Sequence, residues 1–281
     1  MLTTVQGPIT STHDDQVIEN LRIQYDGPSG SAALVIDHSN VTVRNCRIEA
    51  DGPAGCIRVN SGVSSALVEH CYLDGMSPSY GTSRSDGNHG NPGLWFESIA
   101  TGRRNFITGV RVAIRTRVFG CVLEENYVDS LHRNVDGVST SSFSMPWGTT
   151  VSNPPWTILR RCRIVSGSSG GVTMYPRNGP FRNILVENNL VVGVGLGFGI
   201  RGGRASTDHG HYCDNRDQRI EGNRFQGTFG FPSALGEGTN AGVDLGRPGN
   251  TFTDNRWVDG TSDLPARCGV SQNACEGASC P

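Results

Sequence analysis

One short segment of the sequence gathers groups suited to proton transfer. Asp129 and Asp136 lie close together in the chain, and His132 lies between them. Carboxyl and imidazole groups are common general acids and bases. Glycoside hydrolysis needs two carboxyl groups flanking the scissile bond. A β-elimination needs one base and a group that neutralises the substrate carboxylate. The segment therefore predicts acid–base chemistry, with a simple turn at Asp136 and Gly137 as the alternative.

The basic residues supply candidates for a β-elimination. Every one of the 24 basic residues is arginine, which excludes Schiff-base chemistry, a P-loop and a lysine base. An arginine, histidine or tyrosine with a shifted pKa can take a proton, while arginine or Ca²⁺ neutralises the carboxylate. Solvated or salt-bridged side chains are the alternative for each candidate. The candidates for this role are Arg201, Arg177, Tyr175 and His132.

The segment 204–217 is the densest cluster of groups able to bind a ligand. It contains His209 and His211 between Asp208 and Asp214. Imidazole and carboxylate suit zinc and other transition ions, but the spacing matches no known metal site, and a polar surface loop is the alternative. We place His209 and His211 among the substrate-binding candidates and leave the metal open.

Composition narrows the class of protein. The chain has 281 residues, a net charge of −2 and no basic block, which argues against a nucleic-acid partner. No apolar run approaches the roughly 20 residues of a membrane span. The first residues lack the pattern of a signal peptide. The nine cysteines form no CxxC pair, which argues against structural zinc.

A short pattern of alternating apolar residues recurs about every 25 residues, with insertions. Period-two alternation indicates strands, and the Gly-, Ser-, Asn- and Asp-rich segments between them indicate turns. Short strands at a fixed period fit a solenoid whose coils stack at about 4.8 Å. Equivalent residues then lie above one another inside. The expected interior anchors are Leu21, Cys46, Cys71, Cys121, Cys162, Asn189, Asn223 and Asn255.

A second strand follows most anchors, and long insertions border it on both sides. Loops on a rigid scaffold often carry function, so we expect a groove floored by these second strands. Alternation predicts an outward row of aromatic, arginine and carboxylate side chains, which suits sugars; an ordinary solvated face is the alternative. The expected floor comprises Arg58, Asn60, Trp95, Glu97, Ser139, Ser141, Thr173, Tyr175, Arg201 and Asp244, with Trp147 and Arg177 beside it.

The period, the Cys and Asn columns and phrases such as VTVRNCRI at Val41 resemble the right-handed parallel β-helix of the pectin-lyase-like superfamily. The resemblance extends from about Val17 to Asp259. It implies an all-β, single-stranded solenoid of about eight or nine coils. Because that superfamily hosts lyases, hydrolases, epimerases, tailspikes and adhesins, it does not fix the activity.

One motif resembles a catalytic one. Asn134 and Asp136 match the N-x-D-G motif of family 28 polygalacturonases, in which the aspartate acts as an acid. That family has a Gly-Asp-Asp segment in the next coil, where this chain has Gly167 to Gly170 with two serines between. Both partner carboxylates are missing, so that hydrolytic mechanism does not transfer.

We therefore expect a β-helix over residues 1–260 and a cysteine-containing tail or cap over 261–281. The expected function is binding and cleavage of a uronate-containing polysaccharide, with a lyase narrowly ahead of a hydrolase. The alternative is a non-catalytic glycan-binding or structural β-helix. The sequence identifies no definite cofactor and leaves the need for Ca²⁺, which is compatible with a lyase, open. The expected location is extracellular or on a virion, as a monomer or homotrimer with no membrane partner.

Overall fold

Strands of two to six residues recur along the whole described chain. The computed structural model describes residues 1–28, 30–51, 55–75, 92–129, 131, 141–145, 151–167, 170–174, 182–194, 200–201, 216–228 and 248–258. In these ranges there is no α-helix, and no helix long and apolar enough to cross a membrane. All strand pairs are parallel and form three sheets, called A, B and C.

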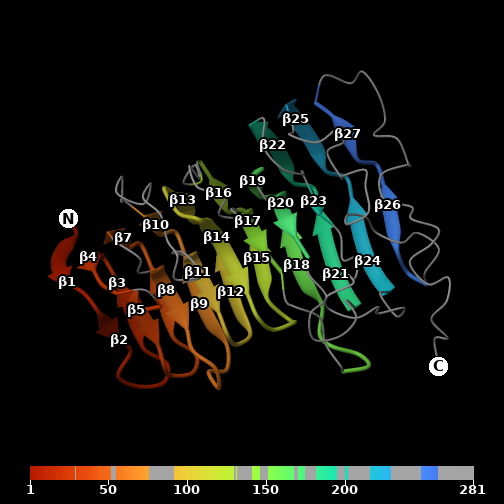
Figure 1. Ribbon diagram of the computed structural model, residues 1–281. Helices are drawn as coiled ribbons and strands as arrows, with labels where there is room; N and C mark the ends of the chain where they lie inside the picture. Colours follow the sequence, from red (N-terminus) through yellow and green to blue (C-terminus); the bar gives the residue numbers. More distant parts are fainter. Residues whose placement is uncertain are drawn as a thin grey trace.

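Sheet A runs along the molecule from the N-terminal coil to the last described one (Figure 1). Its strands are β1 (Thr3–Gln6), β4 (Leu21–Asp26), β7 (Arg47–Asp51), β10 (Tyr72–Asp74), β13 (Phe106–Thr108), β16 (Tyr127–Val128), β19 (Arg163–Val165), β22 (Leu190–Val194), β25 (Arg224–Thr228) and β27 (Arg256–Trp257).

Sheet B follows sheet A within each coil. Its strands are β2 (Ile9–Thr10), β5 (Ala32–Ile36), β8 (Gly55–Val59), β11 (Pro92–Phe96), β14 (Val112–Thr116), β17 (Ser141–Ser144), β20 (Gly170–Thr173) and β23 (Ile200–Arg201).

Sheet C completes the coil. Its strands are β3 (Val17–Glu19), β6 (Thr42–Arg44), β9 (Ala66–Glu69), β12 (Ala100–Arg103), β15 (Val122–Glu124), β18 (Thr157–Arg160), β21 (Arg182–Glu187), β24 (Arg216–Glu221) and β26 (Thr251–Thr253).

The chain visits sheets A, B and C in turn and then begins the next coil. Each strand therefore pairs with its counterpart one coil later. Parallel strands joined by crossovers wind right-handedly, and the fold is a right-handed parallel β-helix, as the sequence predicts. Figure 1 shows the strands in sequence order from β1 to β27 along the helix. The long connections flank sheet B on both sides, as expected, although most of their residues lie outside the described ranges.

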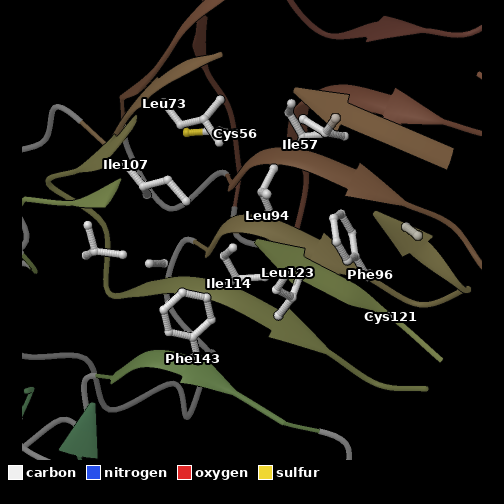
Figure 2. Packing of buried hydrophobic residues seen from close by; sticks show 14 of the residues in the cluster. Cys56, Ile57, Leu73, Leu94, Phe96, Ile107, Ile114, Cys121, Leu123 and Phe143 are labelled. Atoms are coloured by element: carbon white, nitrogen blue, oxygen red, sulfur yellow. The ribbon is translucent and has the colours of Figure 1, made fainter. Parts of the chain in front are cut away.

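The core is a set of side-chain columns inside the coils. Ile57, Leu94, Ile114 and Phe143 occupy one register position on successive strands of sheet B, and all four are fully buried (Figure 2). Stacking equivalent positions places apolar residues on apolar residues, since period-two alternation turns every second side chain inward. A fully buried aliphatic or aromatic side chain stabilises the fold by about 1.5–3 kcal/mol.

Sheets C and A meet at a one-residue corner in the left-handed backbone region. Asn20, Asn45 and Asn188 occupy this corner in three of the coils, with φ between 51° and 60°. The left-handed region is unfavourable for most residues, and asparagine tolerates it better than others. The corner turns the next side chain inward, where Leu21, Cys46, Cys71, Asn105, Asn126, Cys162, Asn189, Asn223 and Asn255 form a column.

The asparagines in this column tie neighbouring coils together. Asn189 Oδ1 accepts a hydrogen bond from the Cys162 backbone N–H at 2.9 Å, and its Nδ2 donates to the Leu159 carbonyl at 3.1 Å. Its own backbone N–H donates to Asn223 Oδ1 at 3.0 Å. Asn223 repeats the arrangement with Asn255. Corner N–H and C=O groups that the sheets leave unpaired are thereby satisfied inside the core.

Cys121 does not belong to this column, and the prediction that placed it there is wrong. It follows Gly120, at the opposite corner of sheet C, where φ is +95°. Both corners of sheet C present a left-handed residue followed by a small buried one, so the same local pattern occurs twice in a coil. Asn105 and Asn126 occupy the column between Cys71 and Cys162 instead.

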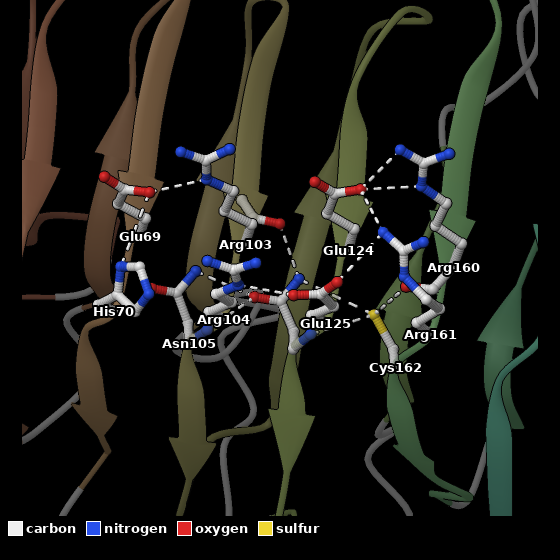
Figure 3. A network of polar contacts seen from close by, with 12 residues as sticks. Glu69, His70, Arg103, Arg104, Asn105, Glu124, Glu125, Arg160, Arg161 and Cys162 are labelled. Carbon is white, nitrogen blue, oxygen red and sulfur yellow. Dashed lines mark hydrogen bonds and ion pairs between the residues drawn. The ribbon is translucent and has the colours of Figure 1, made fainter.

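Charge alternates along the outer face of sheet C. Glu69, Arg103, Glu124 and Arg160 share one register position on successive strands (Figure 3). Arg103 Nε lies 2.7 Å from Glu69 Oε2, and Arg160 Nη2 lies 2.7 Å from Glu124 Oε2. Like charges directly opposite each other are destabilising. A register that placed two of these carboxylates on neighbouring strands directly opposite each other would therefore be less stable.

Asn189→Ala tests the column directly. It leaves the Cys162 N–H and the Leu159 carbonyl buried without their partner, which costs about 1–3 kcal/mol for each group. We expect a loss of about 2–4 kcal/mol in the free energy of unfolding, measured by urea denaturation. The control is Asn188→Gly, because that neighbouring side chain is exposed and glycine accepts its left-handed φ. Equal effects of the two substitutions would contradict the role of the column.

Candidate ligand-binding site

The outer face of sheet B carries one row of side chains set by strand register. Arg58, Trp95 and Arg115 occupy the same position on β8, β11 and β14. Ser144 continues the row on β17, and Thr173 occupies the same register position on β20, where it is buried. Arg58 and Trp95, both expected on the outward face of the second strands, therefore share one register position on sheet B.

The row continues to Arg201 on β23, whose backbone pairs with Thr173. In the β17 coil we expected Ser141 on the outward face. The structure instead places Ser144 in the row, and Ser141 is buried.

Three guanidinium groups gather around the Trp95 indole. The Cζ atoms of Arg58, Arg117 and Arg115 lie 4.6, 4.8 and 5.7 Å from the centre of the ring. A guanidinium within about 6 Å of an indole is attracted by the ring quadrupole. The indole therefore supports the cations, and these three side chains cover it where we expected a sugar ring to stack.

Glu97 balances two of these cations. Arg58 donates to Glu97 Oε2 from Nε at 3.0 Å and from Nη2 at 2.6 Å. Arg117 Nη1 lies 3.2 Å from Glu97 Oε1. Both carboxylate oxygens are thus engaged, and the role of Glu97 in the described structure is to hold Arg58 and Arg117 in place.

Arg115 is the cation that this arrangement does not neutralise. Burial, followed by the positive charges of Arg117 and Arg111, lowers its pKa to about 10. Within the described part of the chain, the Arg115 guanidinium has no carboxylate at ion-pair distance. A partly buried cation beside two others attracts an anion, because binding removes both the repulsion and the loss of hydration.

The Trp95 indole adds an unused hydrogen-bond donor. Its Nε1 is buried and has no acceptor in the described structure, and the residue is only 9% exposed. An unpaired buried donor costs about 1–3 kcal/mol. The cost falls if a ligand or water brings an acceptor oxygen to this position.

A groove continues from the charged cluster around the corner between sheets B and C. It has a volume of about 710 Å³, and Glu97 and Arg117 line the end nearest Trp95. Ile99 and Val151 are among the apolar side chains that line it further along. Volumes of about 300–1,000 Å³ are typical of small-molecule sites, so the groove can hold part of a ligand that also contacts the charged cluster.

The sequence-predicted site residues fall into two groups. Arg58, Trp95 and Glu97 meet in the cluster, whereas Asp129 is exposed at the end of β16 in sheet A, where its carbonyl accepts from Arg163. Arg201 is placed by its backbone alone. The predicted residues that lie outside the described ranges are His132, Asp136, Trp147, Tyr175, Arg177, His209 and His211.

Arg115 and Arg117 are site residues that the sequence reasoning missed. The segment around Arg117 reads like a repeat anchor ending at Cys121, which concealed the strand before it. A signal was present, because Ala113-Ile114-Arg115 repeats the order small, Ile, Arg of Cys56-Ile57-Arg58. Register places Arg58 and Arg115 on either side of Trp95.

A second aromatic group on sheet A is less suited to bind a sugar. Tyr72, Phe106 and Tyr127 stack on successive coils, with ring centres 5.1 and 5.2 Å apart. Arg47 lies over Tyr72 at one end and Arg163 over Tyr127 at the other. The ring faces are therefore covered by one another and by the arginines, so this stack is best explained as support for the coil.

The cluster is better suited to binding an anion than to acid–base catalysis. Glu97 is the only carboxylate found in contact with these arginines in the described ranges, and it is engaged on both oxygens. Glycoside hydrolysis needs a second one. In those ranges no three His, Cys, Asp or Glu side chains gather as metal ligands. The geometry supplies positive charge, hydrogen-bond donors and a neighbouring groove.

No model of a known protein family matches the chain, and no curated protein matches it. Among solved structures, the crystal structure of the Dettilon tailspike protein matches with a TM-score of 0.35 and 12% sequence identity. The match covers 90% of this chain and 61% of the tailspike chain. The chain thus spans less than two thirds of that protein.

Arg115→Gln tests whether this cation is held at a cost to stability. Removing a desolvated charge that is repelled by Arg111 and Arg117 should raise the free energy of unfolding by about 1–2 kcal/mol, after allowance for solvent screening. Thermal unfolding at neutral pH measures the change. Arg103→Gln serves as control, because Arg103 lies 2.7 Å from Glu69 and its removal should not stabilise. A clear loss of stability in Arg115→Gln would contradict this description of the site.

Proposed function

We propose that this β-helix binds an acidic polysaccharide over sheet B without cleaving it, with an anionic group of the glycan held at Arg115. The observation that carries the proposal is the partly buried Arg115 guanidinium, which stands beside two further arginines and has no carboxylate of its own in the described structure. A uronate carboxylate accepts two parallel hydrogen bonds from a guanidinium, which gives both affinity and orientation.

The shape of the scaffold supports a polymeric ligand. The row from Arg58 to Arg201 crosses six strands of sheet B, and neighbouring strands are about 4.8 Å apart. An extended chain of sugars laid along the helix axis meets a new side chain at each coil. A location outside the cell or on a virion is part of the proposal, since acidic polysaccharides are found on cell surfaces. Membership of the pectin-lyase-like superfamily is proposed on the three-sheet parallel coil.

Cleavage by β-elimination is the second candidate function. The observation in its favour is again Arg115, because a guanidinium whose pKa is lowered to about 10 loses its proton more easily, and only the unprotonated form can act as the base. The residues expected from the sequence to assist it, among them His132 and Tyr175, lie outside the described ranges. Ultraviolet absorbance of unsaturated products during incubation with the glycan distinguishes a lyase from a binding protein.

A panel of alginate, polygalacturonate and glycosaminoglycan oligosaccharides, with dextran as the neutral control, tests the proposal by titration calorimetry. We expect at least one acidic glycan to bind and dextran not to bind. Arg115→Gln should weaken binding about tenfold or more, because a charge-assisted hydrogen bond contributes about 1.5–3 kcal/mol. Arg256→Gln, an exposed arginine of sheet A, should bind like the unmodified protein. Binding that survives Arg115→Gln unchanged would refute this site.

The pH dependence follows from the lowered pKa of Arg115. An anion binds the protonated form of the guanidinium, so binding raises the pKa of Arg115. Affinity is therefore lost as pH rises through the pKa that Arg115 has in the unbound protein. With that pKa at about 10, we expect constant affinity from neutral pH to about 9 and a decline above about 10. Uronate groups stay ionised throughout this range. An affinity that is flat beyond pH 11 in a still-folded protein would show that Arg115 is not the cation involved.

A further inference from the structure

The groove beyond Glu97 has walls of a different chemistry from the charged cluster. Ile99 is 48% exposed and Val151 is 57% exposed, and both belong to the groove lining, as does the exposed Pro155. The hydroxyl-bearing residues Ser64 and Ser65 line it as well. Exposed aliphatic side chains that share one hollow indicate a site for an apolar group.

The outer wall is held in a fixed position. The segment 151–155 accepts hydrogen bonds from Arg182 Nη1 at the Val151 carbonyl and from Arg216 Nη2 at the Ser152 carbonyl, at 3.0 and 3.3 Å. Asn183 Nδ2 donates to Asn153 Oδ1 at 3.0 Å and to the Pro154 carbonyl. Donors on two later coils therefore fix this wall, and the groove exists before a ligand arrives.

Gly120 lies beside two lining residues of the groove, Ile99 and Pro155. A Cβ atom at this position would lie 2.9 Å from Pro155 Cγ and 3.1 Å from Ile99 Cδ1, and the φ of +95° also disfavours other residues. Glycine here lets Ile99 and Pro155 come together as one apolar surface. Ile99 and Pro155 therefore form an exposed aliphatic patch beside the charged cluster.

The groove and the charged cluster are continuous. Strand β11 runs from Trp95 towards Glu97 and Ile99, and Glu97 and Arg117 belong to both the cluster and the groove lining. A glycan with its acidic sugar at Arg115 therefore reaches the Ile99 surface where its next unit turns from the helix axis to the strand direction, towards Glu97. We expect that unit to be uncharged, because the ionised groups among the described lining residues, Glu97 and Arg117, already pair with each other.

We propose that this groove accommodates an N-acylated amino sugar adjacent to the acidic sugar, so that the ligand is a glycan containing both. This inference rests on the proposed function. A plain hexose offers aliphatic walls its ring C–H groups but no methyl group. An acylamino group presents a methyl group to Ile99 and Val151, while its amide can hydrogen-bond with the Ser64 and Ser65 hydroxyls.

Oligosaccharides of alternating glucuronate and N-acylated glucosamine, with formyl or acetyl as the acyl group, test the inference by titration calorimetry. The two probes carry the same charges and differ by one methyl group at each amino sugar. We expect the acetylated form to bind about fourfold more tightly, because one buried carbon contributes about 0.8 kcal/mol. The substitutions Val151→Ser and Ile99→Ser should each reduce this ratio towards one.

Val17→Ser is the matched control, because Val17 is 50% exposed on β3 and lies outside the groove. It should keep the fourfold ratio. Equal affinity of the unmodified protein for both probes, together with loss of binding in Arg115→Gln, would overturn the groove inference and leave the proposed function intact. Failure of every acidic glycan to bind would overturn both.

Discussion

The structure depends on one constraint: each coil must lie on the preceding one with no shift in register. Backbone pairing alone allows slippage, since every parallel position makes similar hydrogen bonds. Side chains inside the corner remove that freedom, because Asn189 and Asn223 bond to groups on neighbouring coils. Outside, Arg103 lies directly opposite Glu69 and Glu124 in this register, and a shift along the strand would separate these opposite charges.

Fixed register is also what creates the candidate site. Arg58 and Trp95 are 37 residues apart in sequence and adjacent in space because β8 pairs with β11. Arg115 joins them from β14. The same stacking gathers Glu97 and Arg117 at the strand ends and begins the groove over Ile99. The repeat supplies a rigid surface, and the residues that differ from coil to coil supply the chemistry.

Sequence reasoning found the fold because period-two alternation and a recurring corner residue are local signals. It placed Trp95 on the outward face of its strand, as the structure does, while the neighbouring Leu94 is buried in the core. It misplaced Cys121, since both corners of sheet C share one local pattern, and this error concealed Arg115. The lowered pKa of Arg115 has no sequence signal at all, because it arises from burial and from arginines brought near by folding.

The most direct test of the account is a crystal structure of the protein with a bound acidic oligosaccharide. The account predicts a carboxylate of the sugar about 2.7–2.9 Å from the Arg115 guanidinium nitrogens, with the glycan lying over sheet B. A glycan seated on sheet A beside Tyr127, or on sheet C, with Arg115 making no contact to it, would contradict the account.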